Sequence, residues 1–208
     1  MRLLAIITGL LLLILAVTPV MNLQPDLIRL DHILLTPGAE LWLGGDELGR
    51  SIAQRLLLGA RLSLMVALVV VSISALFGIS IGLVAGYLGG WVDQLIMRII
   101  DVVLAFPGLL LAIALAGLLG PGIDNLMIAL VAVGWVGFAR LARAQVLSLR
   151  EADHVQAGHA LGSSGFFIVR FHLLPLIAAP LIIEATFGIA GAVLAEAGLS
   201  FLGLGIQP

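Results

Sequence analysis

The sequence predicts an all-α, polytopic membrane protein, a helical bundle with about five transmembrane helices. Hydrophobic residues make up 62% of the 208 residues and charged residues 11%, against about a quarter in a typical soluble domain. Five apolar runs are each long enough to cross a hydrocarbon core about 30 Å thick, which takes roughly 20 helical residues. These runs are residues 3–20, 62–83, 99–119, 126–147 and 176–204. The period-two alternation of a membrane β-barrel is absent, which favours helices.

Residues 1–20 are predicted to form the first transmembrane helix. They also resemble a secretory signal peptide, but the apolar run is longer than the roughly 7–15 residues of a signal core. Residues 21–61 have the composition of a soluble protein and are expected to form an external or interfacial segment. Within this segment Gly44-Gly45 predicts a turn, followed by an amphipathic helix lying on the bilayer. The apolar face of that helix would consist of Leu48, Ile52, Leu56 and Gly59.

Residues 62–208 are predicted to form the core of the bundle, with a tight loop over 86–98 and a turn over 120–125. Asp101 follows Arg98 by three residues, a spacing that favours an ion pair on one helix face. Pro107 and Pro180 lie inside predicted spans and are expected to bend them. A four-residue spacing places three glycines on one helix face, which would contact either a second subunit or another helix of this chain. These glycines are Gly78, Gly82 and Gly86.

The ten basic residues are all arginines, and their positions favour a cytoplasmic amino terminus. This orientation places six arginines and residues 150–175 in the cytoplasm, and the carboxyl terminus outside. The net charge of -2 is too small to indicate nucleic acid binding. The chain contains no cysteine, which excludes disulfides, thiolate metal sites and a cysteine nucleophile.

Residues 150–175 form a polar interval between two apolar runs and are the strongest candidate for a functional site. Residues 151–161 favour a helix, the Gly-Ser-Ser-Gly run at 162–165 interrupts it, and residues 166–173 start a second helix that Pro175 ends. Two short helices around a corner would form a cytoplasmic knob. Such a knob can insert side chains into a groove of another protein. Candidates for insertion are Gln156, His159 and the Phe166-Phe167 pair.

The spacing within the knob resembles the signature loop of permease subunits of bacterial binding-protein-dependent ATP-binding cassette (ABC) importers. That loop has a Glu-Ala-Ala triplet, three residues, a glycine, nine residues and an Ile-x-Leu-Pro ending. In this chain Gln156 replaces the acid, Gly158 replaces an alanine and His172 replaces the isoleucine. The resemblance implies an ATPase-coupling loop containing Gln156, Ala157, Gly158, His159, Gly162, His172, Leu174 and Pro175.

Further segments resemble the dipeptide, oligopeptide and nickel branch of these permeases, and within it the second permease of the pair. They are GDELGRS at 45–51, GARLSL at 59–64, AGYLGGWVDQLIMR at 85–98, LAFPGLLLAIAL at 104–115 and LAEAGLSFLGLGIQP at 194–208. The resemblance covers about residues 40–208. It implies a sixth span after the last segment, which this sequence does not contain, so we expect the chain alone not to be a fully competent subunit.

The resemblance implies a type I ABC importer permease fold in the inner (plasma) membrane of a bacterium or archaeon. The implied function is import of dipeptides or oligopeptides. A nickel or metal-chelate importer is the alternative, and a non-transporting truncated or regulatory fragment is a third hypothesis. The implied partners are a related second permease, two ATP-binding subunits, an external solute-binding protein and membrane lipid. The chain itself is expected to bind no cofactor, because it has no phosphate-binding loop ending in Gly-Lys-Ser/Thr and no lysine. ATP and Mg²⁺ are expected on the ATPase.

Glu184 and Glu196 lie inside the last predicted span, where an ionisable group costs several kcal/mol unless it is paired or hydrated. Twelve residues separate them by about 18 Å and about 120°, so they cannot line one narrow stripe. Each is either hydrogen-bonded within the bundle or part of a translocation path. Our hypothesis is that Glu184 faces the path.

An enzyme and a metal site are the remaining hypotheses. An intramembrane hydrolase using Asp101 or Glu184 would need a second catalytic group, and the sequence has no nucleophile motif and no HExxH pair. The knob contains His154, His159 and His172, whose spacing differs from the i, i+4 spacing of a helical metal site. The chain is therefore predicted to be neither an enzyme nor a metal-binding protein.

Overall fold

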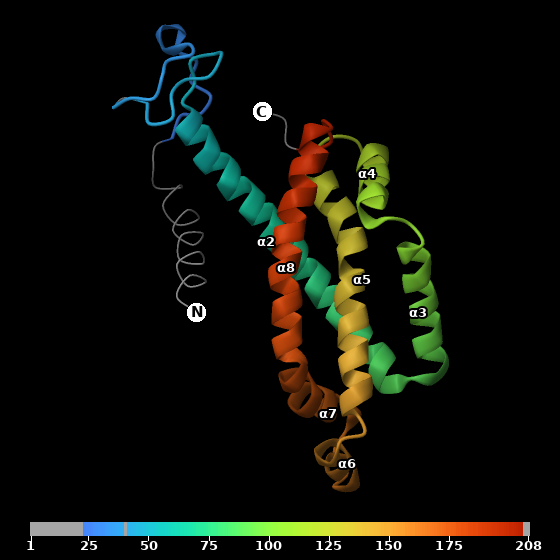
Figure 1. Cartoon of the computed structure of the whole chain (residues 1–208). Helices are drawn as coiled ribbons and strands as arrows, with labels where there is room; N and C mark the ends of the chain where they lie inside the picture. The colour runs from blue at the N-terminus through green and yellow to red at the C-terminus, as the bar shows by residue number, and fades with distance from the viewer. Residues whose placement is uncertain (1–22, 40, 206–208) are drawn as a thin grey trace. The chain divides into compact units, whose positions relative to one another are not determined.

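The computed structural model describes residues 23–39 and 41–205, so the predicted first span and Gln207-Pro208 lie outside the described residues. Regular structure in the described residues is helical, which confirms the all-α prediction (Figure 1). The elements are the 3₁₀ helix η1 (Leu30–His32), α2 (Ile52–Leu88), α3 (Gly90–Leu104), α4 (Gly108–Leu119), α5 (Ile123–Leu149), α6 (Asp153–Ala160), α7 (Gly165–Ile168), a π-helical turn η2 (Val169–Leu173) and α8 (Leu174–Phe201).

The chain divides into two compact units, residues 1–65 and 66–208, and the division falls within α2. Three helical segments are long and apolar enough to cross a membrane: α2, α5 and the continuous run Gly165–Phe201. The pair α3 and α4 is bent by 81° and would be a fourth span if it crosses as one broken helix. The described residues therefore contain three or four of the predicted spans.

The amphipathic helix and the second span, predicted as separate elements, are one helix, α2. Leu48 lies before its start and is not part of the predicted apolar face. No proline occurs between Ile52 and Leu88, and a single interior glycine such as Gly59 costs a helix only about 1 kcal/mol. The polar composition before residue 62 therefore marks no helix end.

Two predicted connections also differ in the structure. The loop over 86–98 is reduced to a break at Gly89 and Gly90, whose φ angles are 64° and 58°, and α3 begins at once. Pro107 lies in the break between α3 and α4, where the predicted third span bends by 81°, because proline lacks an N–H and restricts the residue before it. Pro180, by contrast, lies inside an uninterrupted α8.

In the unit formed by residues 66–208, α5 is the central helix, with α8 on one side and α4 and α3 on the other (Figure 1). The glycine face of α2 packs on α5: Gly78 lies against Trp135 and Phe138, and Gly82 against Ala139. The sequence left open whether this face contacts a second subunit or another helix of this chain. The structure shows a contact with another helix of this chain.

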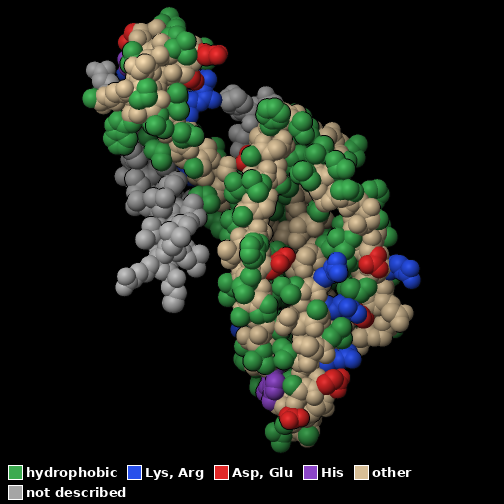
Figure 2. Space-filling model, in the orientation of Figure 1, with side chains coloured by type: hydrophobic (Ala, Val, Ile, Leu, Met, Phe, Trp, Pro, Cys, Tyr) green, Lys and Arg blue, Asp and Glu red, His purple; other side chains and the backbone are tan. Residues whose placement is uncertain are grey.

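Charged side chains are distributed unevenly over this unit. On the face in Figure 2 most of them gather toward the end that carries α6 and α7, while the end around α4 is mainly hydrophobic. One buried cluster, which includes Val146, Val155, Ile168 and Leu173, packs the short helices onto the ends of α5 and α8. The knob is thus part of the folded bundle and not a loose loop.

Candidate functional site

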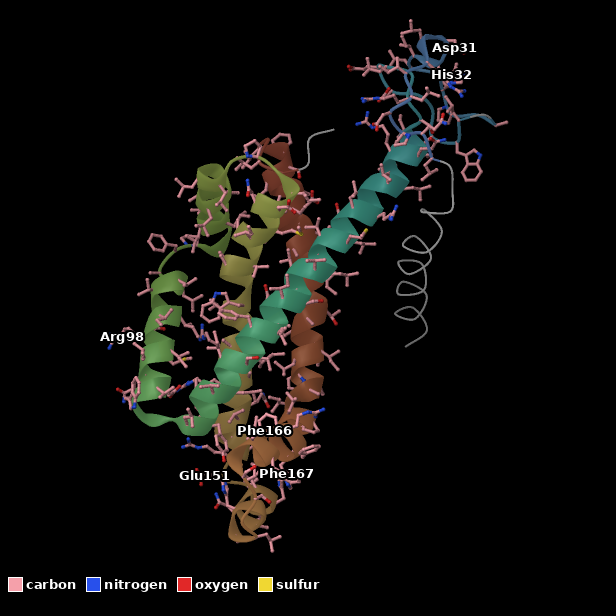
Figure 3. The ribbon with its side chains drawn as sticks, turned by 180° about the vertical axis from the view of Figure 1, so that it is seen from behind. Asp31, His32, Arg98, Glu151, Phe166 and Phe167 are labelled. Atoms are coloured by element: carbon pink, nitrogen blue, oxygen red, sulfur yellow. The ribbon has the colours of Figure 1, made fainter. Side chains whose placement is uncertain are left out.

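The knob joins the end of α5 to the start of α8, with α6 and α7 at one end of the bundle (Figure 3). Val155 is fully buried, and an added Cβ at Gly158 would lie 3.7 Å from Ile168 Cγ1. These two positions form the inner face of α6. Gln156, Ala157 and His159 are exposed. The positions matching the importer signature are therefore split between an anchored face and a free face.

Gly162 forms the corner of the knob. Its N–H donates to His159 O at 2.9 Å and the next N–H, of Ser163, donates to Gly158 O at 3.0 Å. This is the hydrogen-bond pattern of a Schellman motif, which needs a left-handed residue after the helix. Gly162 has φ of 80°. The sequence predicted the break at this residue, and the structure gives its cause.

The second half of the knob differs from the prediction, because Pro175 does not end the helix. The Ser164 hydroxyl caps α7 by accepting from Phe167 N–H at 3.3 Å, and helical structure then continues to Phe201. The Leu174 N–H bonds five residues back, to Val169 O, in the π turn. Pro175, one residue later, has no N–H to donate, and its ring crowds the preceding turn. The wider π turn accommodates both.

Gln156 holds the start of α6 to the end of α5. Its Nε2 donates to Arg150 O at 3.2 Å and to Glu151 Oε2 at 3.4 Å. An amide can donate to both oxygens, whereas the acid found in the importer signature would place a second carboxylate against Glu151. The structure thus explains why glutamine fits at this position.

Ring contacts join the knob helices to one another and to α2. His154 and His172 stack with centroids 6.3 Å apart, and Phe167 lies 5.9 Å from the His172 ring. His159 stacks on Tyr87 of α2, also at 6.3 Å. Within the described residues no three His, Cys, Asp or Glu side chains are placed to hold a metal ion. The histidines thus make ring contacts at the surface of the knob, and His154 and His159 remain exposed.

Exposed apolar side chains remain on the outside of the knob. Leu161 is 87% exposed and Phe166 is 79% exposed, and Figure 3 shows Phe166 and Phe167 at this end of the bundle. Exposed aromatic and aliphatic groups beside polar ones are typical of a protein contact surface.

An ion pair that sequence reasoning missed joins α3 to α5 beside the knob. Asp93 accepts from Arg143 Nε, and its second oxygen accepts from Nη2 at 2.6 Å. Arg150 Nη1 also donates to Gly86 O at 3.3 Å. The predicted pair of Arg98 and Asp101 is wrong: no ion pair joins them in the described part of the chain, and Arg98 extends away from α3 (Figure 3).

The two acidic residues of α8 lie in different surroundings. Glu196 is 4% exposed and accepts from Ser200 Oγ at 2.8 Å. Glu184 is half-buried, and its Oε1 lies 2.8 Å from the position of a Cβ added at Gly137 of α5. The glycine therefore leaves room for this carboxyl group. Whether either residue lines a translocation path stays a prediction.

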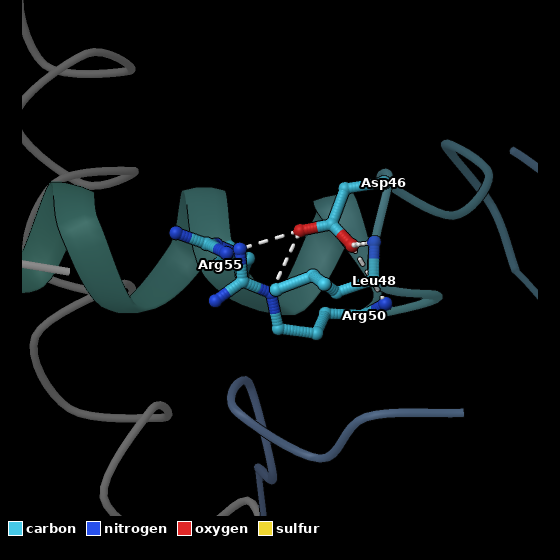
Figure 4. Close-up of polar contacts among 4 residues, drawn as sticks. All are labelled: Asp46, Leu48, Arg50 and Arg55. Atoms are coloured by element: carbon cyan, nitrogen blue, oxygen red, sulfur yellow. Dashed lines mark hydrogen bonds and ion pairs between the residues drawn. The ribbon is translucent and has the colours of Figure 1, made fainter. Parts of the chain in front are cut away.

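In the unit formed by residues 1–65, the GDELGRS segment is organised around Asp46 (Figure 4). Its Oδ1 accepts from the N–H groups of Leu48 and Arg50, and its Oδ2 from the guanidinium groups of Arg50 and Arg55, all at 2.8–3.0 Å. Partial desolvation raises the pKa of Asp46, but these bonds outweigh it and lower the pKa to about 2. The carboxylate thus fixes the turn before α2.

These features define an integral membrane component with a structured polar knob at one end of its helices. The chain belongs to the family of binding-protein-dependent transport system inner membrane components, whose profile matches residues 78–208. It is therefore a multi-pass inner-membrane component.

Three relatives show the range of similar proteins. The chain is 47% identical to a dipeptide transport system permease protein, DppC, of Alkalihalophilus pseudofirmus, over 82% of this chain and 56% of that protein. It is 40% identical to a probable D,D-dipeptide transport system permease protein, DdpC, of Escherichia coli, over 98% of this chain and 68% of that protein. It is 38% identical to a glutathione transport system permease protein, GsiD, of Pectobacterium atrosepticum, over 86% of this chain and 59% of that protein. The chain thus spans between about half and two thirds of these relatives.

Proposed function

We propose that this chain is a permease subunit of an ATP-driven ABC importer that moves dipeptides or oligopeptides across the inner membrane. The observation that carries this proposal is the knob, whose signature positions Gln156, Ala157 and His159 form an exposed face on a buried anchor. The relatives named above are permeases for dipeptides, D,D-dipeptides and glutathione. These names favour a peptide over nickel as the solute.

In this mechanism the knob docks in a groove of a separate ATPase, where α6 supplies polar contacts and Leu161 and Phe166 supply apolar ones. ATP with Mg²⁺ is bound and hydrolysed by two such ATPase subunits, and this chain has no enzymatic role. An external binding protein delivers the peptide, and a related second permease completes the path. The amino terminus is cytoplasmic, which places the knob on the side of the ATPases.

Movement of the knob reaches the membrane through α8. Helical structure is unbroken from Gly165 to Phe201, so a displacement of α7 by the closing ATPases is carried into a span. The π turn at Val169–Leu173 lies where this force enters, and π turns are frequent at functional positions. Glu184, eleven residues after Leu173 on this helix, would move with it.

Uptake of a radiolabelled dipeptide tests this function, in cells or vesicles that contain the chain with its partner subunits. Ala157→Trp adds bulk to the exposed face of α6, and Leu118→Trp places the same side chain on α4, where Leu118 is 84% exposed. We expect Ala157→Trp to abolish ATP-dependent uptake and to remove the ATPase from the purified complex. Leu118→Trp should do neither. Normal uptake by both variants would contradict the proposal.

A further inference from the structure

Two side chains of opposite charge, Arg140 of α5 and Glu184 of α8, have no ion-pair partner in the described part of the chain. Arg140 is exposed and Glu184 is partly exposed. Other charged groups of these two helices are occupied within the bundle, because Arg143 is paired with Asp93 and Glu196 is buried. Arg140 and Glu184 thus remain available to another molecule.

The two side chains lie on one side of the bundle and at one level. Glu184 Oε1 lies 2.8 Å from the position of a Cβ added at Gly137, so the carboxyl group lies over the backbone of α5. Gly137 is exposed, and Arg140 follows it by three residues, about 60° around the helix. At 1.5 Å per residue, Arg140 is about 14 Å from the end of α5, and Glu184 is about 15 Å from the start of α8. Since the knob joins these two ends, the depths are equal.

This depth falls inside the apolar runs at 126–147 and 176–204, where a charged side chain that faces lipid is unfavourable. Two opposite charges on one exposed face therefore indicate an occupant that carries both signs. Helical neighbours three residues apart have Cβ atoms about 5–6 Å apart, which sets the separation of Arg140 from the carboxyl group over Gly137. An extended dipeptide spans roughly 7 Å, so its two ends can reach both groups.

We infer that Glu184 binds the ammonium group of the transported peptide and that Arg140 binds its carboxylate. This inference rests on the proposed function. A guanidinium group binds a carboxylate through two parallel hydrogen bonds, and a carboxylate accepts from an ammonium group. A fatty acid matches only Arg140, and an amine matches only Glu184. The site reads the two ends of the peptide and not its side chains, so it requires both ends to be free.

Competition for a photo-crosslinking dipeptide, one that carries a diazirine analogue of leucine, tests the inference on the purified full chain. The competitors are dialanine, its N-acetyl form and its C-terminal amide. We expect each blocked form to compete about tenfold more weakly than dialanine, since each lacks one hydrogen-bonded charge. Glu184→Gln should remove the preference for the free amine and keep the preference for the free carboxylate. Arg140→Gln should do the reverse.

Variants that keep the charge, Glu184→Asp and Arg140→Lys, should keep both preferences, and so should the control Arg98→Gln, which changes an exposed arginine of α3. Equal weakening of all three competitors in both glutamine variants would assign the two charges to a structural role and overturn the inference. Unchanged preferences in those variants, or no difference among the competitors in the wild type, would also overturn it.

Dipeptide uptake by the assembled importer reports the proposed function separately. Uptake without a preference for free peptide ends at this site contradicts only the inference. The two preferences without uptake support the site and contradict the transport function.

Discussion

Gly158 in α6 and Gly162 just after its end have different structural roles although they are four residues apart. Gly162 adopts a left-handed conformation that completes the end of the helix, whereas Gly158 lies on the buried face with room for a methyl group. The spacing of the importer signature identified both positions. Only the structure shows that Gly162 is required by the backbone and that an alanine would fit at 158.

Gly162→Ala should destabilise the knob by about 1 kcal/mol, because a Cβ is unfavourable in the left-handed region. Gly158→Ala should be neutral or slightly stabilising, since its Cβ meets atoms only at 3.7 Å or beyond. Amide hydrogen exchange across α6 measures both effects. Gly162→Asn is a control, because asparagine tolerates this conformation. Equal protection in Gly162→Ala and the wild type would refute the assigned role of the corner.

Asp46 makes the stability of the turn before α2 depend on acid pH. The folded pKa of Asp46, about 2, lies below the ordinary aspartate value of 3.8, so its contribution to stability is complete above pH 3.8 and is lost as the pH falls through 2. Hydrogen exchange of the Leu48 and Arg50 amides, corrected for the intrinsic rate at each pH, should therefore show loss of protection from about pH 4 to 2. Asp46→Asn should remove this pH dependence. A transition of the same size in Asp46→Asn would assign it to another group.

At the level of elements, the contact between α2 and α5 depends on backbone approaching backbone. Gly82→Val should destabilise the bundle by about 1–3 kcal/mol, because its side chain would overlap the Ala139 carbonyl. Gly117→Val in α4 is the matched control, since a Cβ there meets no atom within 4 Å. Thermal unfolding in detergent measures both. A smaller loss in Gly82→Val than in Gly117→Val would contradict the packing described here.

The ion pair of Asp93 and Arg143 fixes α3 against α5. The Asp93 side chain is 15% exposed and that of Arg143 is 28% exposed, so solvent screens the pair only in part. Asp93→Asn should cost about 2 kcal/mol, as for a hydrogen bond to a charged group. Arg98→Gln, on the exposed face of the same helix, should cost almost nothing. A double-mutant cycle of Asp93→Asn with Arg143→Gln measures the coupling, and a coupling near zero would show that the pair does not join the helices.

Hydropathy located the membrane helices but not all of their ends. The runs at 126–147 and 176–204 correspond to α5 and α8 because apolar length alone predicts a span. The start of α2 at Ile52 and the start of α3 at Gly90 depend on which glycines adopt positive φ, and composition does not encode this. The π turn and the pairing of residues 93 and 143, fifty positions apart, depend on tertiary packing and have no local signal.

At the scale of the whole molecule, the knob that we propose as the docking surface is also the start of a membrane span. Its inner face is held by Val155, Ile168 and Leu173, and its outer face presents Gln156 and Ala157. A rigid connection of this kind is what an ATP-driven permease needs, because movement at the surface must reach the helices. We therefore propose that the exposed face of α6 contacts an ATPase.

Cysteine crosslinking measures that contact directly, because the chain contains no native cysteine. Ala157→Cys lies on the exposed face of α6, and Leu118→Cys is the control on α4. In membranes containing the partner subunits, with a cysteine introduced into the ATPase groove, we expect an oxidant or a short bismaleimide to join that thiol to the thiol of Ala157→Cys, with a yield that changes when ATP is added. Leu118→Cys should form no such link. No ATPase link from Ala157→Cys, or an equal link from both variants, would show that this face of α6 does not dock on the ATPase.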